Sequence, residues 1–199
     1  MNWIKRLFVG GSAGNEQLTA VVAVILVLLL AIEGATLLQL ASLLTVHAFV
    51  GMILIPVVAL KLASTGWRML RYYLGGEEYV RRGPPHVVLR MLVAPAMIAS
   101  TLVLFGTGVA LLALGQTSGT IVGLHKASFV VWLGAAGVHV LAHASKLPRF
   151  IRSRAPGAAL RVAAAASAVV AGALLATATL PAAARLQDRA SAYVGLDAD

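Results

Sequence analysis

The stretch LHKASFVVWLGAAGVHVLAHASK, residues 124–146, decides how this chain folds and what it binds. It is an apolar run that carries His125, His139 and His143. An α-helix advances ~1.5 Å and turns ~100° per residue, so His125 and His139 lie about 21 Å apart on nearly one face, which His143 shares. Ionisable side chains inside a bilayer are costly and usually face a bundle interior, and neutral imidazole binds iron readily. The stretch therefore predicts a membrane helix that binds haem.

The composition of the whole chain is that of a polytopic membrane protein. Over 199 residues, 60% are hydrophobic and 12% charged, with a mean hydropathy of +0.90. Residues 1–17 include Lys5 and Arg6 but no compact apolar core with a small-residue cleavage pattern, so we expect no removable signal peptide. The first membrane helix then serves as the insertion signal.

Cysteine is absent, and this bounds the redox chemistry. Disulfides, thiolate-ligated iron–sulfur clusters and covalently attached c-type haem all require cysteine, so any haem here is held without a covalent tether. The formal net charge of +9 follows the membrane topology rather than one continuous basic patch, so we expect no nucleic-acid partner.

Hydropathy predicts an all-α fold of five transmembrane helices in an antiparallel bundle, since about 20 apolar residues cross a ~30 Å hydrocarbon core. The expected spans are residues 18–40, 44–73, 90–114, 124–146 and 160–180. The corresponding organisation is a cytoplasmic segment 1–17, a single five-helix domain 18–181 and an exported tail 182–199. Glu33 lies about two turns from the end of the first span, where we interpret it as an interfacial carboxylate without a role.

The basic residues place the termini. They gather at the N-terminus and around the second and fourth loops, whereas the first and third loops contain none. The positive-inside rule then predicts a protein of the inner (plasma) membrane with a cytoplasmic N-terminus and an exported C-terminus. The second and fourth helices both run from outside to inside, so they are parallel.

That parallel arrangement places His47 of the second helix and His125 of the fourth at one depth, about one turn inside the outer membrane face. Two neutral imidazoles at one depth can bind a haem iron from opposite sides. Lys126 is a candidate partner for a haem propionate. Glycines that leave space for the flat faces of the haem are Gly51, Gly106 and Gly108. The alternative is that both histidines are interfacial residues in contact with water or headgroups.

A second haem near the cytoplasmic face is the further expectation, with His139 as its ligand and His86 or His143 on the other side. Lys61 and Arg90 are the candidate propionate partners. The alternative for His139 and His143 is a hydrogen-bonded polar helix end, or another metal bound through their four-residue spacing. We therefore expect one haem b at His47 and His125, and leave open a second one at His139.

At these residues the sequence resembles the bacterial four-helix b-type membrane cytochromes. This group contains cytochrome b561 and the cytochrome subunits of formate dehydrogenase and nickel–iron hydrogenase, and small actinobacterial cytochrome-like membrane proteins are also similar. The elements that carry the likeness, within about residues 47–146, are VHAFVGMILIPVVALK (46–61), GPPHVVLRMLVAP (83–95) and LHKASFVVWLGAAGVHVLAH (124–143).

The resemblance implies a helical bundle, bis-histidine haem b, and electron exchange with a quinone or a partner oxidoreductase. By this comparison His47 and His125 match outer axial ligands and His139 matches an inner one. The chain departs from the pattern in two ways: Lys61 stands where a deeper histidine of the second helix is expected, and the first and fifth spans contribute no histidine.

The function expected from the sequence is a haem b electron carrier between a quinone pool and a partner oxidoreductase, a relay rather than an enzyme with its own substrate pocket. The competing class is a cofactor-free membrane scaffold or assembly factor, in which the histidines bond between helices. A transporter is a third class, although the chain lacks an evident inverted repeat or paired broken helices.

Overall fold

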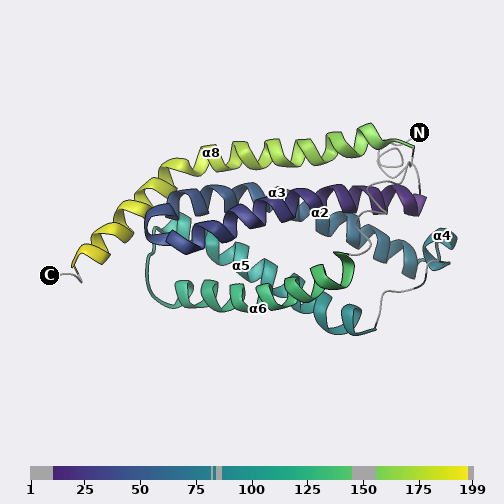
Figure 1. Ribbon diagram of the computed structural model, residues 1–199, viewed down its shortest axis with the longest axis horizontal. Coiled ribbons are helices and arrows are strands. Elements are labelled where there is room, and N and C mark those ends of the chain that lie inside the picture. The colour runs from purple at the N-terminus through teal and green to yellow at the C-terminus, as the bar shows by residue number, and fades with distance from the viewer. Residues whose placement is uncertain (1–10, 82, 84–86, 145–155, 197–199) are drawn as a thin grey trace.

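The computed structural model describes residues 11–81, 83, 87–144 and 156–196, and in this part of the chain every regular element is a helix. The all-α class predicted from the sequence is therefore confirmed (Figure 1). In chain order the elements are α2 (Gly11–Thr36), the 3₁₀-helix η1 (Leu37–Gln39), α3 (Leu40–Tyr73), the short α4 (Glu77–Val80), the π-helical η2 (Leu89–Val93), α5 (Ala94–Leu114), α6 (Thr120–Ala144) and α8 (Ala158–Leu196).

Within the described residues, four continuous helical stretches are long and apolar enough to cross a membrane. They are Gly11–Tyr73, Leu89–Leu114, Thr120–His143 and Ala158–Ala192. Many of their large apolar side chains are exposed, which is unfavourable in water. Leu38 is 85% exposed and Leu141 is 80% exposed. These helices thus have the surface of a lipid-facing protein. The first stretch contains both α2 and α3, so the number of spans depends on the turn inside it.

That turn lies at the 3₁₀-helix η1. Gln39 has φ −139° and ψ 48°, and Leu43 has φ −112° and ψ 16°, so neither residue continues an α-helix. The sequence analysis expected the break at residues 41–43. The irregular backbone includes Leu43 but begins earlier.

Side-chain contacts show that α2 and α3 run antiparallel after this turn. Asn15 Nδ2 donates to the backbone carbonyl of Ser64 at 2.9 Å, and Lys61 Nζ donates to the carbonyl of Thr19 at 2.8 Å. Residues near the start of α2 therefore meet residues near the end of α3, as Figure 1 also shows. Apolar packing continues the contact through a cluster made of Leu18, Val22, Val57 and Ala165.

The helices form two groups. In the first group α3 packs extensively against α8 and α2, and in the second group α5 packs against α6, while α3 and α5 meet over a much smaller area. Gly172 permits the close approach of α8 to α3, because a Cβ atom at this position would lie 2.6 Å from the backbone oxygen of Ile53. The boundary between the two groups is the loosely packed part of the molecule.

The last helix, α8, is longer than the span expected at residues 160–180. It continues to Leu196, so residues 182–196 of the predicted exported tail are helical. Pro181 lies inside this helix, and Figure 1 shows the C-terminal part of α8 turning away from the line of its first part. Gln187 Oε1 accepts from the backbone N–H of Thr45 at 3.1 Å. The predicted tail is therefore joined to the first turns of α3.

A π-helical turn, η2, precedes α5. The backbone N–H of Ala94 bonds to the carbonyl of Leu89, five residues back, and Pro95 follows directly. Proline has no N–H and cannot bond to the carbonyl four residues before it, which accounts for a local change of helical register. Arg90 lies in this turn.

Candidate functional site

The structure brings His47 and His125 together across the boundary between the two helix groups. His47 is on α3 and His125 is on α6, and their ring centres are 6.4 Å apart with the ring planes at 88°. The sequence analysis placed the two residues at one depth from the helical rise alone. The observed contact shows in addition that the two rings face a common space. Their role as iron ligands stays a prediction.

Hydrogen bonds from α5 hold the His125 ring. Its Nδ1 lies 3.1 Å from the backbone oxygen of Leu104 and 3.0 Å from Thr107 Oγ1. A carbonyl oxygen only accepts, and the Thr107 hydroxyl already donates to the carbonyl of Val103 at 2.7 Å, so the proton of this bond belongs to Nδ1. Nε2 of His125 therefore carries a lone pair, the form in which imidazole binds a metal.

Hydrogen bonds from α2 hold the His47 ring in the same tautomer. Its Nδ1 lies 3.0 Å from Thr36 Oγ1, and the Thr36 hydroxyl donates its own proton to the backbone oxygen of Glu33 at 2.6 Å. Thr36 Oγ1 therefore accepts from His47 Nδ1. No hydrogen bond to Nε2 of either histidine is found among the described residues, so both lone pairs remain available.

Glu33 is the member of this site that the sequence analysis missed. Its Oε1 lies 3.1 Å from His47 Nδ1, and its side chain is only 16% exposed. The interpretation of Glu33 as an interfacial carboxylate without a role does not agree with this contact. Two features of the sequence point to Glu33. It lies three residues before Thr36, which places both side chains on one face of the helix. It also precedes the expected break at residues 41–43, after which the returning chain brings His47 back to a similar level.

The three predicted glycines have different surroundings. A Cβ atom at Gly108 would lie 3.2 Å from His125 Cε1, so this glycine lets α5 approach the imidazole. A Cβ atom at Gly51 would lie 3.5 Å from Glu33 Oε1, so Gly51 faces the carboxylate that holds His47. Gly106 faces open space, and Lys126 is exposed.

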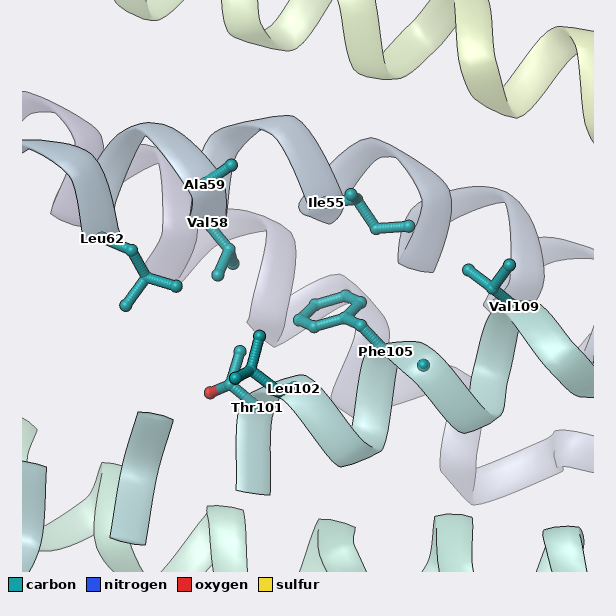
Figure 2. Close-up of a pocket in the computed structure, with 9 residues that line it drawn as sticks. Ile55, Val58, Ala59, Leu62, Thr101, Leu102, Phe105 and Val109 are labelled. Atoms are coloured by element: carbon teal, nitrogen blue, oxygen red, sulfur yellow. The ribbon is translucent and has the colours of Figure 1, made fainter. Parts of the chain in front are cut away.

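An apolar cavity of ≈ 380 Å³ lies between α3 and α5. Figure 2 shows its walls, formed by Ile55, Val58, Ala59, Leu62, Thr101, Leu102, Phe105, Gly106 and Val109. At ~100° per residue, Ile55, Val58 and Leu62 lie within about 80° of the direction of His47 around α3. Ile55 is nevertheless eight positions from His47, about 12 Å along the helix axis. On α5, Phe105 and Gly106 face away from the side of the helix formed by Leu104 and Thr107, which bond to His125. Neither histidine lines the cavity, so it is separate from the contact between the two rings.

The inner histidines are arranged differently. His139 and His143 stack on one helix with ring centres 4.5 Å apart and ring planes at 26°, and His143 Nδ1 lies 2.9 Å from the backbone oxygen of His139. Two such rings lie side by side and do not face each other across a plane. His86, the other predicted inner ligand, lies outside the described residues.

The two predicted inner propionate partners, Lys61 and Arg90, have different surroundings. Lys61 bonds to the backbone of Thr19 and so faces α2. Arg90 is half-buried, and its Nε has no hydrogen-bond partner among the described residues. In the described part of the chain, the structure assembles no second ligand for His139 from another helix. The inner haem stays a prediction.

In residues 11–81, 83, 87–144 and 156–196, no group of three or more His, Asp or Glu side chains is placed to hold a metal ion. A haem iron differs from a free ion because the porphyrin supplies most of its ligands and the protein supplies only the axial ones. No family model, curated protein or solved structure matches this chain. The likeness to b-type membrane cytochromes therefore rests on the sequence elements alone.

Proposed function

We propose that this chain is a five-span haem b electron carrier of the plasma membrane, in which His47 and His125 bind one haem iron from opposite sides. The observation that carries the proposal is the pair itself. Two imidazoles from different helix groups are 6.4 Å apart, and hydrogen bonds at Nδ1 leave Nε2 of each ring available. Metal-binding histidines usually have such a partner on the second ring nitrogen, because it fixes the tautomer and the ring orientation.

The distance between the rings fits this use. Metal–imidazole bonds are about 2 Å long and a ring nitrogen lies about 1 Å from its ring centre, so two axial ligands of one iron have centres roughly 6 Å apart. The observed 6.4 Å agrees with this value. Perpendicular ring planes are compatible with axial ligation, because each plane only has to contain its iron–nitrogen bond.

The antiparallel arrangement of the first two helices supports the proposed count of five spans. α2 has 26 residues and α3 has 34, lengths of ~39 Å and ~51 Å, so each can cross a ~30 Å hydrocarbon layer alone. If α2 and α3 cross separately, α5, α6 and α8 bring the proposed number of spans to five. The distribution of Lys and Arg then supports a cytoplasmic N-terminus and an exported C-terminus.

Each part of the site has a defined task in this proposal. Nε2 of His47 and Nε2 of His125 would hold the haem iron, and the acceptors at Nδ1 orient the two rings. Gly108 allows α5 to support one ring directly. The exposed Lys126 is the candidate partner of a propionate. The haem supplies one-electron Fe(III)/Fe(II) chemistry, and the exchange partners we propose are a quinone and a membrane-associated oxidoreductase.

The test is the haem content and spectrum of the purified protein. We expect a dithionite-reduced minus oxidised spectrum of a low-spin b-type haem, lost or converted to high spin in His47→Ala and in His125→Ala. His143→Ala is the matched control, because that histidine lies on α6 but away from the pair. A folded protein without haem after expression with a haem supply would reject the proposal, as would an unchanged spectrum in both ligand variants.

A cofactor-free scaffold is the second candidate, and one observation favours it. The same hydrogen bonds that orient the rings also join helices, His47 to Thr36 of α2 and His125 to Leu104 of α5. Interhelical bonds of this kind contribute about 0.6–2 kcal/mol in membranes. If stability is their purpose, each His→Ala variant lowers the melting temperature of a protein that contains no haem.

A further inference from the structure

We propose that the apolar cavity between α3 and α5 binds an acyl chain of a membrane phospholipid, which fills the sparsely packed boundary between the two helix groups. Neither His47 nor His125 lines this cavity. The inference therefore goes beyond the proposed haem site and does not depend on it.

The cavity lies at mid-depth in the bundle and is open to its surface. Its wall on α5 runs from Thr101 to Val109, which leaves about 10 Å of helix before it and about 8 Å after it, within Ala94–Leu114. The exposed members of the lining are Ala59, Leu102, Gly106 and Val109. An exposed apolar residue at this depth of a membrane span faces lipid chains. The hydrocarbon of the bilayer is therefore the medium next to the opening.

The chemistry of the walls selects hydrocarbon over a polar headgroup. Thr101 is the polar residue of the lining, and its hydroxyl donates to the backbone oxygen of Met97 at 2.6 Å. The remaining lining residues are aliphatic, aromatic or glycine, as Figure 2 shows. A quinone ring would lose its hydrogen bonds on entering such a space without finding a donor, which is unfavourable. A hydrocarbon chain needs no such bonds.

The size and shape of the cavity fit a chain. An apolar protein cavity of about 150 Å³ stays dry and binds benzene, which has six carbon atoms. At the same filling, ≈ 380 Å³ accommodates roughly 15 carbon atoms. Thr101 and Val109 are eight positions apart, about 12 Å along α5, so the space is elongated along the helix. A flexible chain that lies along α5 fits both the volume and this direction.

A bound chain would supply contacts that the protein itself lacks at this boundary. α3 and α5 meet over a small area, and Gly106 faces open space. Phe105 lies in the gap, with Ile55 and Val58 on the wall formed by α3 (Figure 2). Side chains that border an empty space lose dispersion contacts on that side, and a chain in the cavity restores them. The lipid therefore holds α5 against α3.

The experiment is photo-crosslinking of the purified full chain in nanodiscs whose phosphatidylcholine carries a diazirine near the methyl end of one acyl chain. Illumination releases N₂, and the resulting carbene inserts into a neighbouring C–H bond. Peptide mass spectrometry then compares adducts at the half-buried Ile55 and Phe105 with those at Val130, which lies ten positions into α6 and is 68% exposed. Exposure alone predicts more adducts at Val130. We expect an excess of at least threefold in the cavity.

A cavity-filling variant with a matched control tests the same site by a loss of signal. Gly106→Leu adds a side chain to the cavity wall, and Gly134→Leu adds the same side chain to α6. Both glycines are exposed, and a Cβ atom at either position has no neighbour within 4 Å. We expect Gly106→Leu to lower the adduct yield at Ile55 at least threefold, and Gly134→Leu to leave it unchanged.

Adducts at Ile55 and Phe105 that are no more frequent than at Val130 would overturn the inference, as would equal yields at Ile55 in the two leucine variants. A selective loss of the cavity adducts on adding a minor fraction of isoprenoid quinone would assign the cavity to a quinone tail and would also overturn it. The comparison within the wild type needs no variant, so it decides the matter if Gly106→Leu fails to fold. The haem spectrum tests the proposed function separately.

Discussion

A methyl group added at Gly108 should push the His125 ring out of place. The added Cβ would lie 3.2 Å from His125 Cε1, whereas carbon atoms attract each other best at about 3.5–4.0 Å. In Gly108→Ala the ring therefore has to retreat by a few tenths of an ångström, against hydrogen bonds from Leu104 and Thr107 that oppose the movement. Overpacking of this kind costs about 1–3 kcal/mol.

The matched control is Gly134→Ala on α6, where a Cβ atom has no neighbour within 4 Å. Replacing glycine by alanine within a helix is favourable by about 0.8–1.0 kcal/mol, and both variants share this gain. The difference between the two variants therefore isolates the contact with His125. If this overpacking destabilises only the haem-bound protein, the full 1–3 kcal/mol appears in the binding free energy. Gly108→Ala then weakens haem binding by about 5-fold to 150-fold relative to the control.

The assay is a haem titration of the apoprotein in nanodiscs, followed by the Soret absorption, with thermal unfolding measured in parallel. Gly106→Ala gives a second comparison on the same helix. Gly106 is two residues before Gly108 on α5, but a Cβ atom there has no neighbour within 4 Å. We expect a smaller loss of affinity for Gly106→Ala than for Gly108→Ala. Equal haem affinity in Gly108→Ala and Gly134→Ala would refute the reasoning that the His125 ring at this position binds the iron.

Three further predictions can be tested separately. A periplasmic reporter fused after Asp199 should be active and one fused after Gly83 inactive, and the opposite pattern would contradict the five-span topology. Gly172→Leu should lower the melting temperature far more than Gly66→Leu, because a Cβ at Gly172 would lie 2.6 Å from the Ile53 carbonyl whereas one at Gly66 has no neighbour within 4 Å; similar melting temperatures would show that α8 does not pack on α3 as observed. Pyridine haemochrome analysis should give one haem per chain, and the same value in His139→Ala. The reason is that His139 stacks on His143 and no described helix supplies an opposite ligand. Two haems per chain, with one lost in His139→Ala, would establish the inner site.

The division into two helix groups gives the proposed site a physical basis. α3 is fixed by its packing against α2 and α8, whereas α5 and α6 pack mainly on each other. His47 belongs to the first group and His125 to the second, so a bond from each to one iron would join the groups where protein packing is sparse. Haem binding should for this reason stabilise the whole bundle and not only the site, since a ligand that binds only the folded state adds its binding free energy to stability.

Much of the site could be predicted because depth in a membrane is a one-dimensional property. The apolar runs mark the spans, the basic loops orient them, and the helical rise of ~1.5 Å per residue converts sequence position into depth. These rules placed His47 and His125 at one level before any contact was known. The same rules placed Lys61 at the level of His139, but they contained no information on the direction in which Lys61 points.

Rotation of a helix about its axis and the choice of neighbours depend on packing between segments that are distant in sequence. Lys61 turns toward Thr19 because α3 packs on α2, and Glu33 meets His47 because the chain reverses at Gln39. Hydropathy predicts neither of these two contacts. A polar side chain near the end of a span has the same local sequence whether it faces headgroups or another helix. The sequence by itself therefore determined the helical class and the apolar stretches, and it predicted a common level for His47 and His125. Only the tertiary structure decided which side chains hold them, because hydrogen bonds between helices depend on azimuth as well as depth.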